Sequence, residues 1–282
     1  MTVSKIKTLF KEKLSEFYSE SEIEFLFPLF TEKILNLDKV QLRNQLSKEL
    51  DIHQQSQFQN QILQLQQGKP YQQILGETEF YGMKFWVDEN VLIPRPETEE
   101  LLEFAISKIQ NSKFKIQNFK ILDIGTGSGI IPITLKKHFT NAEISAMDIS
   151  DKALEIAKKN ADFHKTEIHF IQADYLNTDV TEKYDVIISN PPYIGIDENV
   201  EIEDSVKGFE PNLALFSPTS DALIFYRKIA KDCETNLNEN GLFFLEINQK
   251  LGKETLELFK DFSESELVKD ISGNDRFVIG RK

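Results

Sequence analysis

Apolar side chains in the first 75 residues recur at the three- and four-residue spacing that places them on one face of an α-helix. Three such sets follow one another along the chain: Ile6, Leu9, Phe10, Leu14 and Phe17; Ile23, Phe25, Leu26 and Leu29; and Val40, Leu42, Leu46 and Leu50. Ser21 followed by Glu24 resembles a capping box, so the second helix is predicted to begin there. The pattern predicts a small all-α domain over residues 1–75.

Glutamine is frequent between residues 54 and 73. Such a tract is either a low-complexity segment or a helix with one polar face. We favour the helix, because Phe58, Ile62, Leu63 and Leu65 still form an apolar stripe.

The pattern changes to alternating aromatic and β-branched residues from Glu79 onwards. This alternation around residues 88–90 (Asp-Glu-Asn) predicts a β-hairpin, which we assign to a linker over residues 76–96. Pro94 and Pro96 should stop the strand, and Thr98 should lie at the start of the next helix.

Short β-rich runs alternate with helical patterns in the remaining domain, residues 97–282. The predicted strands are residues 120–124, 144–148, 168–173, 185–189 and 242–247, with helices over 152–162 and 222–237 among them. Buried parallel strands joined by helices have this pattern. Residues 266–271 and 276–281 instead indicate an antiparallel edge hairpin. We therefore predict an α/β fold with a doubly wound, mostly parallel, Rossmann-like sheet.

Composition narrows the classes of partner and compartment. The 282 residues are 40% apolar and 28% charged, with 33 Lys and Arg against 46 Asp and Glu, and a net charge of −13. This acidity counts against extensive phosphate neutralisation, so stable nucleic-acid binding is not expected. Cys233 is the single cysteine, which excludes an internal disulfide and favours the cytoplasm. We expect no cleaved signal segment and no membrane span.

A glycine loop follows the first predicted strand of the sheet and leads into an apolar helix. It comprises Gly125, Thr126, Gly127, Ser128 and Gly129. Glycines allow close approach of a ligand to the backbone, and the helix N-terminus offers free N–H donors. The GxGxG spacing is one residue short of the dinucleotide fingerprint, so it is weak evidence alone.

Two aspartates end the next two strands. Asp148 is placed to accept from ribose hydroxyls and Asp174 from an adenine amino group, and Tyr175 offers a flat face. Aspartates after strands are also common helix caps and turn formers. The crevice suits either a nicotinamide dinucleotide or S-adenosylmethionine.

The segment after the fourth strand decides between these cofactors. It is Asn190-Pro191-Pro192-Tyr193, which also occurs as an ordinary strand-terminating turn. Proline restricts the backbone here, so the Asn190 side-chain oxygen and the Pro191 carbonyl form a rigid pair of acceptors beside the cofactor. Two acceptors match one planar –NH₂ group, of a carboxamide or a nucleobase, against which Tyr193 should lie flat. This favours N-methylation with S-adenosylmethionine over hydride transfer. The four histidines show no catalytic pairing, and we expect no metal.

Four segments together resemble the peptide chain release factor glutamine methyltransferases, or protein-(glutamine-N5) methyltransferases. They read ILDIGTGSG, IISNPPYI, VLIPRPETEELL and GFEPNLAL, and the resemblance covers nearly all of residues 70–282. It implies a class I methyltransferase fold and methylation of the glutamine in the Gly-Gly-Gln loop of release factors. A helical N-terminal domain, here a substrate-recognition domain, is typical of that family.

The resemblance also implies roles for individual residues. The glycine loop would hold the methionine part of the cofactor, Asp148 the ribose, Tyr175 the adenine, and residues 190–193 the target glutamine, with Asn190 also contacting the cofactor. Arg95 and Glu210 lie in family motifs without an assigned role; a salt bridge and a loop brace are the structural alternatives. This sequence differs from the family at two places. Tyr175 occupies a position where the family often has Trp, and the stretch before Gly68 is rich in glutamine where the family often has arginine.

Three other functions are compatible with these motifs: adenine N6 methylation of nucleic acid, methylation of a ribosomal-protein glutamine, and non-catalytic nucleoside binding. Charge counts against the first, because residues 96–282 contain 22 basic and 33 acidic side chains. Residues 194–206 contribute five acids and no base, namely Asp197, Glu198, Glu201, Glu203 and Asp204. This segment should repel a phosphate backbone and attract a basic protein surface. We expect a monomer, since nothing indicates an obligate assembly.

Overall fold

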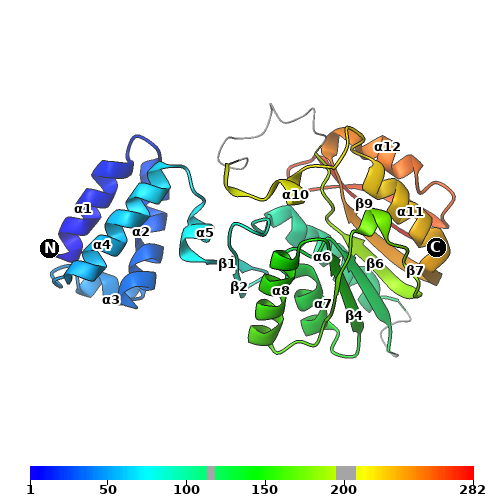
Figure 1. The fold of residues 1–282 in the computed structure, drawn as a ribbon, viewed down its shortest axis with the longest axis horizontal. Coiled ribbons are helices and arrows are strands. Elements are labelled where there is room, and N and C mark those ends of the chain that lie inside the picture. The colour runs from blue at the N-terminus through cyan, green and yellow to red at the C-terminus, as the bar shows by residue number, and fades with distance from the viewer. Residues whose placement is uncertain (113–117, 195–207) are drawn as a thin grey trace. The chain divides into compact units, whose positions relative to one another are not determined.

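The computed structural model describes residues 1–112, 118–194 and 208–282. These residues form two compact units (Figure 1). The first comprises Met1–Glu77 with Gly208 and Phe209, and the second comprises the described residues of Thr78–Ile194 and Glu210–Lys282. The functional roles predicted for the domains stay predictions.

The first unit is helical. Its helices are α1 (Val3–Leu14), α2 (Glu20–Leu35), α3 (Lys39–Asn44), α4 (Ile52–Gln66) and α5 (Tyr71–Leu75). They enclose an aromatic core in which Phe10 meets Phe27 edge-on at 5.5 Å between ring centroids and Phe27 stacks with Phe58. The glutamine-rich tract forms α4 and α5 with Phe58 buried, which confirms the predicted helix.

Two details of the helical prediction are wrong. The capping box of α2 is formed by Ser19 and Glu22, not by Ser21 and Glu24, because the Ser19 hydroxyl is the group that reaches the N–H three residues on. In the third apolar set, Leu42 and Leu50 are buried, whereas Val40 is 68% exposed. The reason is that α3 has just six residues and cannot turn the whole set inward.

The hairpin is present, but its turn lies earlier than predicted. Strands β1 (Glu77–Phe80) and β2 (Met83–Trp86) are joined by Tyr81 and Gly82, both with positive φ (52° and 67°). A two-residue turn of this hand usually needs Asn or Gly at its first position. Tyr81 adopts it here because its N–H donates to Glu99 Oε1 (2.6 Å) and its hydroxyl to Glu103 Oε1, a tertiary contact invisible in the local sequence.

A seven-stranded sheet forms the second unit, in the order β5-β4-β3-β6-β7-β9-β8. The parallel strands are β3 (Lys120–Ile124), β4 (Glu143–Asp148), β5 (His169–Gln172), β6 (Tyr184–Ser189) and β7 (Leu237–Glu246). β8 (Glu264–Lys269) and β9 (Asp275–Arg281) are antiparallel at one edge. The predicted class I fold is confirmed.

Helices cover both faces of this sheet (Figure 1). α6 (Pro96–Gln110), α7 (Ile130–His138) and α8 (Asp151–His164) share one core with Val186 and Ile188, while α11 (Ile224–Asn236) shares the other with Ile187. α12 (Gly252–Glu257) and α10 (Asn212–Leu215) are shorter. The chain runs outwards from β3 through β4 to β5 and then returns to β6 on the other side. Ligands bind at the carboxyl ends of strands at such a switch point. No helix in the described ranges is long and apolar enough to span a bilayer.

Candidate active site

A pocket of about 260 Å³ opens at the carboxyl ends of β3, β4, β5 and β6. Its lining brings together most of the predicted site residues: Gly125, Gly127, Asp148, Asp174, Tyr175, Asn190, Pro191 and Pro192. The predicted residues Thr126, Ser128, Gly129 and Tyr193 do not line it. A larger hollow of about 850 Å³ lies between α11 and the 3-10 helix η2 (Tyr175–Asn177), away from the glycine loop. The strand-end pocket is therefore the candidate site.

The glycine loop is held open by backbone conformation and by Asp148. Gly125, Gly127 and Gly129 have φ of 76°, 53° and 80°, which side chains rarely adopt. A Cβ on Gly129 would also lie 3.1 Å from Ala157 Cβ of α8, which is tighter than ordinary packing, so a larger residue would require α8 to shift slightly. Asp148 Oδ2 accepts from Gly127 N at 2.8 Å. The carboxylate predicted to meet a ribose thus also fixes the loop.

The Asp148 carboxyl lies at the junction of β4 and α8. Its Oδ1 accepts from Ser150 N at 2.9 Å. Burial raises the pKa of Asp148, and backbone N–H donors, among them Ser150 and Gly127, oppose that shift. Both oxygens retain lone pairs for a further donor, because a carboxylate oxygen that accepts from one backbone N–H can accept again.

Asp123 is a buried carboxylate beneath the glycine loop. It is 0% exposed, and neither of its oxygens has a hydrogen-bond partner among the described residues. The hydroxyl of Thr126 lies near Asp123 and lowers the Asp123 pKa. Its geometry does not meet that of a hydrogen bond, so this buried hydroxyl also has no partner among the described residues. Burial nevertheless dominates and raises the pKa of Asp123 to about 7. Asp123 does not itself line the pocket, but Ile124 and Gly125, which follow it directly in the chain, do. A buried polar group without a partner needs an explanation, and a role in ligand binding is one.

Tyr175 is fixed on η2 by contacts from α11. Its hydroxyl donates to Asp232 Oδ2 at 2.7 Å, and Lys228 Nζ lies 4.5 Å from its ring centroid. Lys228 also pairs with Asp232 at 3.0 Å. Phe225 is stacked nearly parallel to the ring, with an interplanar angle of 8°. The aromatic face at this pocket is therefore held in one orientation.

Asp174 caps η2, which is one of the two alternatives for a strand-end aspartate. Its Oδ1 accepts from Leu176 N (3.1 Å) and its Oδ2 from Asn177 Nδ2 (2.7 Å). The side chain still lines the pocket, so a contact with a nucleobase stays a prediction.

Asn190 follows β6 directly, and its backbone lies close to the glycine loop. A Cβ on Gly125 would be 3.8 Å from the Asn190 carbonyl oxygen. Asn190 Nδ2 donates to Thr98 Oγ1 at 3.2 Å. Pro191 and Pro192 continue the pocket wall. Tyr193 is partly buried; burial raises its pKa, so its phenol is neutral at pH 7.

Arg95 and Glu210, which had no role assigned from the sequence, form a salt bridge with each other. Arg95 Nη2 lies 2.6 Å from Glu210 Oε1, and Glu210 Oε2 accepts from Ile93 N at 3.1 Å. Glu210 is 5% exposed, so this pair braces the segment before α10. The acidic segment, residues 194–206, lies outside the described residues except for Ile194.

The remaining candidate groups have packing roles. His164 bonds to the Lys84 carbonyl at 2.7 Å and packs on Phe85, and Cys233 is fully buried with a raised pKa. Among the described residues no group of three His, Cys, Asp or Glu side chains could hold a metal ion.

Three buried polar residues near the pocket were not predicted from sequence. They are Asp123, Thr98 in its contact with Asn190, and Glu246, whose Oε2 accepts from Thr98 Oγ1 at 2.8 Å. Asp123 and Glu246 share one signal, an acid within an apolar strand, since buried acids are rare unless they are partnered or functional. The sequence predicted Thr98 only as a residue at the start of a helix, and no residue near it in the chain indicates a contact with Asn190.

Two family models match this chain. Residues 103–205 match the model described as the Methyltransferase small domain, and residues 10–76 match the PrmC N-terminal domain. Among solved structures, a methyltransferase from Pyrococcus furiosus is similar over 80% of this chain and 98% of that one, with a TM-score of 0.50 and 18% identity. That likeness shows the shared fold.

Curated relatives are similar along the whole length. A release factor glutamine methyltransferase from Flavobacterium psychrophilum is 46% identical over 99% of this chain and 98% of that protein. One of the same name from Bacteroides thetaiotaomicron is 34% identical over 99% and 100%. A third, from Lactococcus lactis, is 44% identical over 76% of this chain and 78% of that protein.

Proposed function

Because this chain belongs to the release factor glutamine methyltransferase family, we propose that it transfers a methyl group to the side-chain amide nitrogen of the glutamine in the Gly-Gly-Gln loop of peptide chain release factors, and so tunes translation termination. The observation that carries this proposal is the position of Asn190 and Pro191 in the wall of the strand-end pocket. Their two acceptor oxygens match the two N–H groups of a primary amide.

The methyl donor that fits this pocket is S-adenosylmethionine. The unpartnered carboxylate of Asp123 suits a cationic ligand, and the N-terminus of α7, which directly follows the glycine loop, suits a carboxylate. Asp148 would hold the ribose and Tyr175 the adenine. When bound, this cofactor supplies an electrophilic methyl group on its sulfonium sulfur.

The residues of the chain supply alignment and electrostatic stabilisation. An amide nitrogen is a poor nucleophile, because its lone pair is delocalised into the carbonyl. Asn190 Oδ1 and the Pro191 carbonyl would accept both amide protons, aim the nitrogen and stabilise positive charge developing on it. The neutral Tyr193 ring would cover the amide plane. Positioning of this kind contributes about 7–11 kcal/mol. As the nitrogen–carbon bond forms, the methyl–sulfur bond breaks, and the amide nitrogen, once positively charged, releases one of its two protons to solvent, so no strong base is needed.

A methyl-transfer assay tests the proposal. Tritiated S-adenosylmethionine is incubated with the protein and a recombinant release factor, with a Gln→Asn variant of the Gly-Gly-Gln loop as control. We expect label in the wild-type factor alone. Parallel arms contain total RNA and DNA, and ribosomal proteins. Label in either of those arms, and none in the factor, would replace the proposal by one of the two alternatives.

We further propose that the protein acts as a cytoplasmic monomer on a protein substrate, without stable nucleic-acid binding. The acidic net charge of −13 supports the last of these points, the absence of stable nucleic-acid binding. Light scattering during size-exclusion chromatography, with and without added RNA, should show one 32.6 kDa species in both runs.

Asp232→Asn should weaken S-adenosylmethionine binding about 3- to 10-fold, because Tyr175 loses a charged hydrogen-bond partner and Lys228 loses its counter-ion. At saturating cofactor, kcat should change less than about 2-fold, since Asp232 touches neither substrate. Isothermal titration and a turnover assay measure the two. Tyr175→Phe should raise Kd by a similar factor, and the double variant Asp232→Asn/Tyr175→Phe should raise it no further. The exposed Asp261→Asn is the control; a fall in kcat without a change in Kd would contradict this role.

A further inference from the structure

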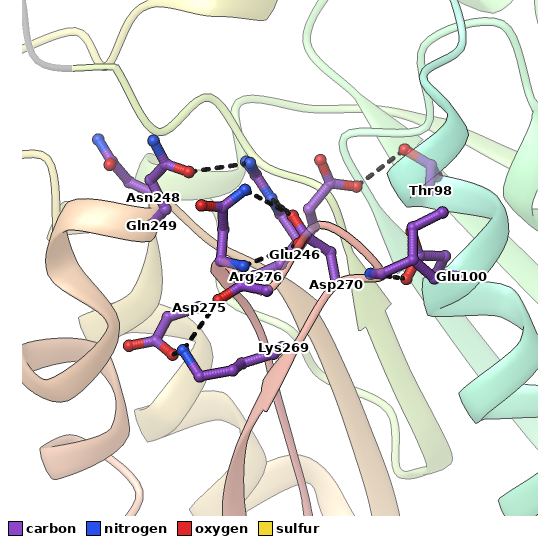
Figure 2. Close-up of polar contacts among 12 residues, drawn as sticks. Thr98, Glu100, Glu246, Asn248, Gln249, Lys269, Asp270, Asp275 and Arg276 are labelled. Carbon is purple, nitrogen blue, oxygen red and sulfur yellow. Dashed lines mark hydrogen bonds and ion pairs between the residues drawn. The ribbon is translucent and has the colours of Figure 1, made fainter.

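A buried chain of hydrogen bonds connects Glu246 to Asn190 through Thr98. Thr98 Oγ1 donates to Glu246 Oε2 at 2.8 Å (Figure 2), and Asn190 Nδ2 donates to Thr98 Oγ1 at 3.2 Å. Thr98 is 2% exposed and Glu246 1%. Thr98 lies in α6, Glu246 ends β7 and Asn190 directly follows β6. They meet because Ser189 lies opposite Leu245, so β6 and β7 end side by side.

The direction of each bond in this chain follows from Glu246. An ionised carboxylate only accepts, so the single hydroxyl proton of Thr98 is committed to Glu246. The Thr98 oxygen then has lone pairs but no proton for Asn190. It therefore selects the Asn190 amide orientation in which Nδ2 points to Thr98, and Oδ1 is the atom left for the pocket.

We propose that Glu246 and Thr98 are positioning residues that hold the Asn190 amide with Oδ1 facing the substrate –NH₂ group. This inference rests on the proposed function, because it assigns Asn190 Oδ1 as one of the two acceptors for the glutamine amide. With the Asn190 amide reversed, its NH₂ group would face the substrate NH₂ group, and neither could accept from the other. Glu246 and Thr98 thus act on selectivity through Asn190 without touching the substrate.

The surroundings of Glu246 set the pH at which the hydrogen-bond chain Glu246–Thr98–Asn190, here called the relay, has this direction. The charged and titratable groups that act on it or contact it are Arg276 of β9, Arg95, Glu97 of α6, Tyr193, and Tyr226 of α11, whose hydroxyl donates to the Glu246 carbonyl at 3.0 Å. Arg276 is itself held by Asp270 (3.2 Å) and Gln249 (3.3 Å), as Figure 2 shows.

Burial raises the pKa of Glu246 to about 7, opposed by Thr98, Arg276 and Arg95. Below that pH a protonated Glu246 donates to Thr98, which frees the Thr98 hydroxyl proton for Asn190 Oδ1 and reverses the chain. Turnover at saturating substrates should therefore rise as pH increases through about 7.

Conservative variants of the relay test it. Glu246→Gln preserves shape but donates to Thr98, so kcat for release factor methylation should fall about 10- to 100-fold with Kd for S-adenosylmethionine changed less than about 3-fold. The acid limb of the pH profile should disappear. Thr98→Val should lower kcat by a similar factor, whereas Thr98→Ser, which keeps the hydroxyl, should keep most of the activity.

Two matched variants separate positioning from stability. Thr134→Val removes a buried hydroxyl that bonds only within α7, to Ile130 O at 2.6 Å, and Glu182→Gln removes an exposed charge. Both should leave kcat unchanged, whatever they do to Tm. Equal activities of Thr98→Val and Thr98→Ser, or an unchanged kcat in Glu246→Gln, would overturn the proposal.

A readout independent of methylation distinguishes this inference from the proposed function. The side-chain amide ¹⁵N–¹H₂ resonances of Asn190 should show one slowly exchanging proton above pH 7, and Glu246→Gln should abolish that protection. Protection retained in Glu246→Gln contradicts the relay. Wild-type protein that shows the protected amide but does not label a release factor contradicts the proposed function alone.

Discussion

Asn190→Ala should lower kcat for release factor methylation about 10²- to 10³-fold. The substitution removes one of two acceptors that stabilise charge developing on the amide nitrogen, and loss of one such group has this order of effect. Kd for S-adenosylmethionine should change less than about 3-fold, because Asp123, the glycine loop, Asp148 and Tyr175 stay in place. Turnover and isothermal titration measure the two quantities.

Asn111→Ala is the matched control for this variant. Asn111 lies at the far end of α6, where its side-chain amide donates to Ser107 O at 2.9 Å. It should retain full activity. A turnover of Asn190→Ala equal to that of wild type would mean that the sheet serves as a nucleoside-binding scaffold without catalysis at this segment.

Asp123→Asn should change stability and cofactor affinity in opposite directions. A carboxyl whose folded-state pKa is raised from 3.8 to about 7 destabilises the fold progressively as pH rises from about 4 to about 7, and by a constant amount above that. The variant lacks the ionisable group and therefore this pH-dependent destabilisation. Its free energy of unfolding relative to wild type should therefore increase as pH rises from 5 to 8, by a total of about 1–3 kcal/mol.

The same substitution should weaken S-adenosylmethionine binding about 10- to 100-fold at pH 8, because the variant lacks the buried negative charge that the proposed function assigns to attraction of a cationic ligand. In wild type, affinity should rise as pH increases through about 7, since the ionised Asp123 binds better; in the variant this contribution should vanish. Denaturant unfolding and titrations at pH 6 and pH 8 measure both effects. Unchanged affinity at pH 8 would exclude Asp123 as part of the cofactor site.

Asp185→Asn is the control for Asp123→Asn. Asp185 lies at the other end of the sheet and accepts from Lys120 N and Asn238 Nδ2, both at 2.8 Å. It should lower stability slightly at all pH values and leave cofactor affinity unchanged.

Features set by local sequence were predictable. Four of the five parallel strands match their predicted runs to within one residue at each end, because buried strands need continuous apolar residues. β7 begins at Leu237, five residues before its predicted run, since its first residues are not a continuous apolar run. The edge hairpin is present, with its first strand displaced by two residues. The glutamine-rich helix α4 was recognisable because Phe58 and its apolar neighbours kept helical spacing. Where several local signals competed, prediction failed: Ser19 rather than Ser21 caps α2, and Tyr81 occupies a turn position usually taken by Asn or Gly.

The sequence by itself determined that the glycine loop, Asp148, Tyr175 and Asn190 would meet at one edge, because the carboxyl ends of parallel strands share that edge whatever the details of packing. Only the tertiary structure decided what holds these groups. Thr98 and Glu246 reach Asn190 from 92 and 56 positions away, and Asp232 reaches Tyr175 from 57. Hydrogen bonds extend about 3 Å, so their partners follow from how α6, α11 and β7 pack against β6. The identity of the reacting groups is local, and their orientation depends on residues distant in the chain.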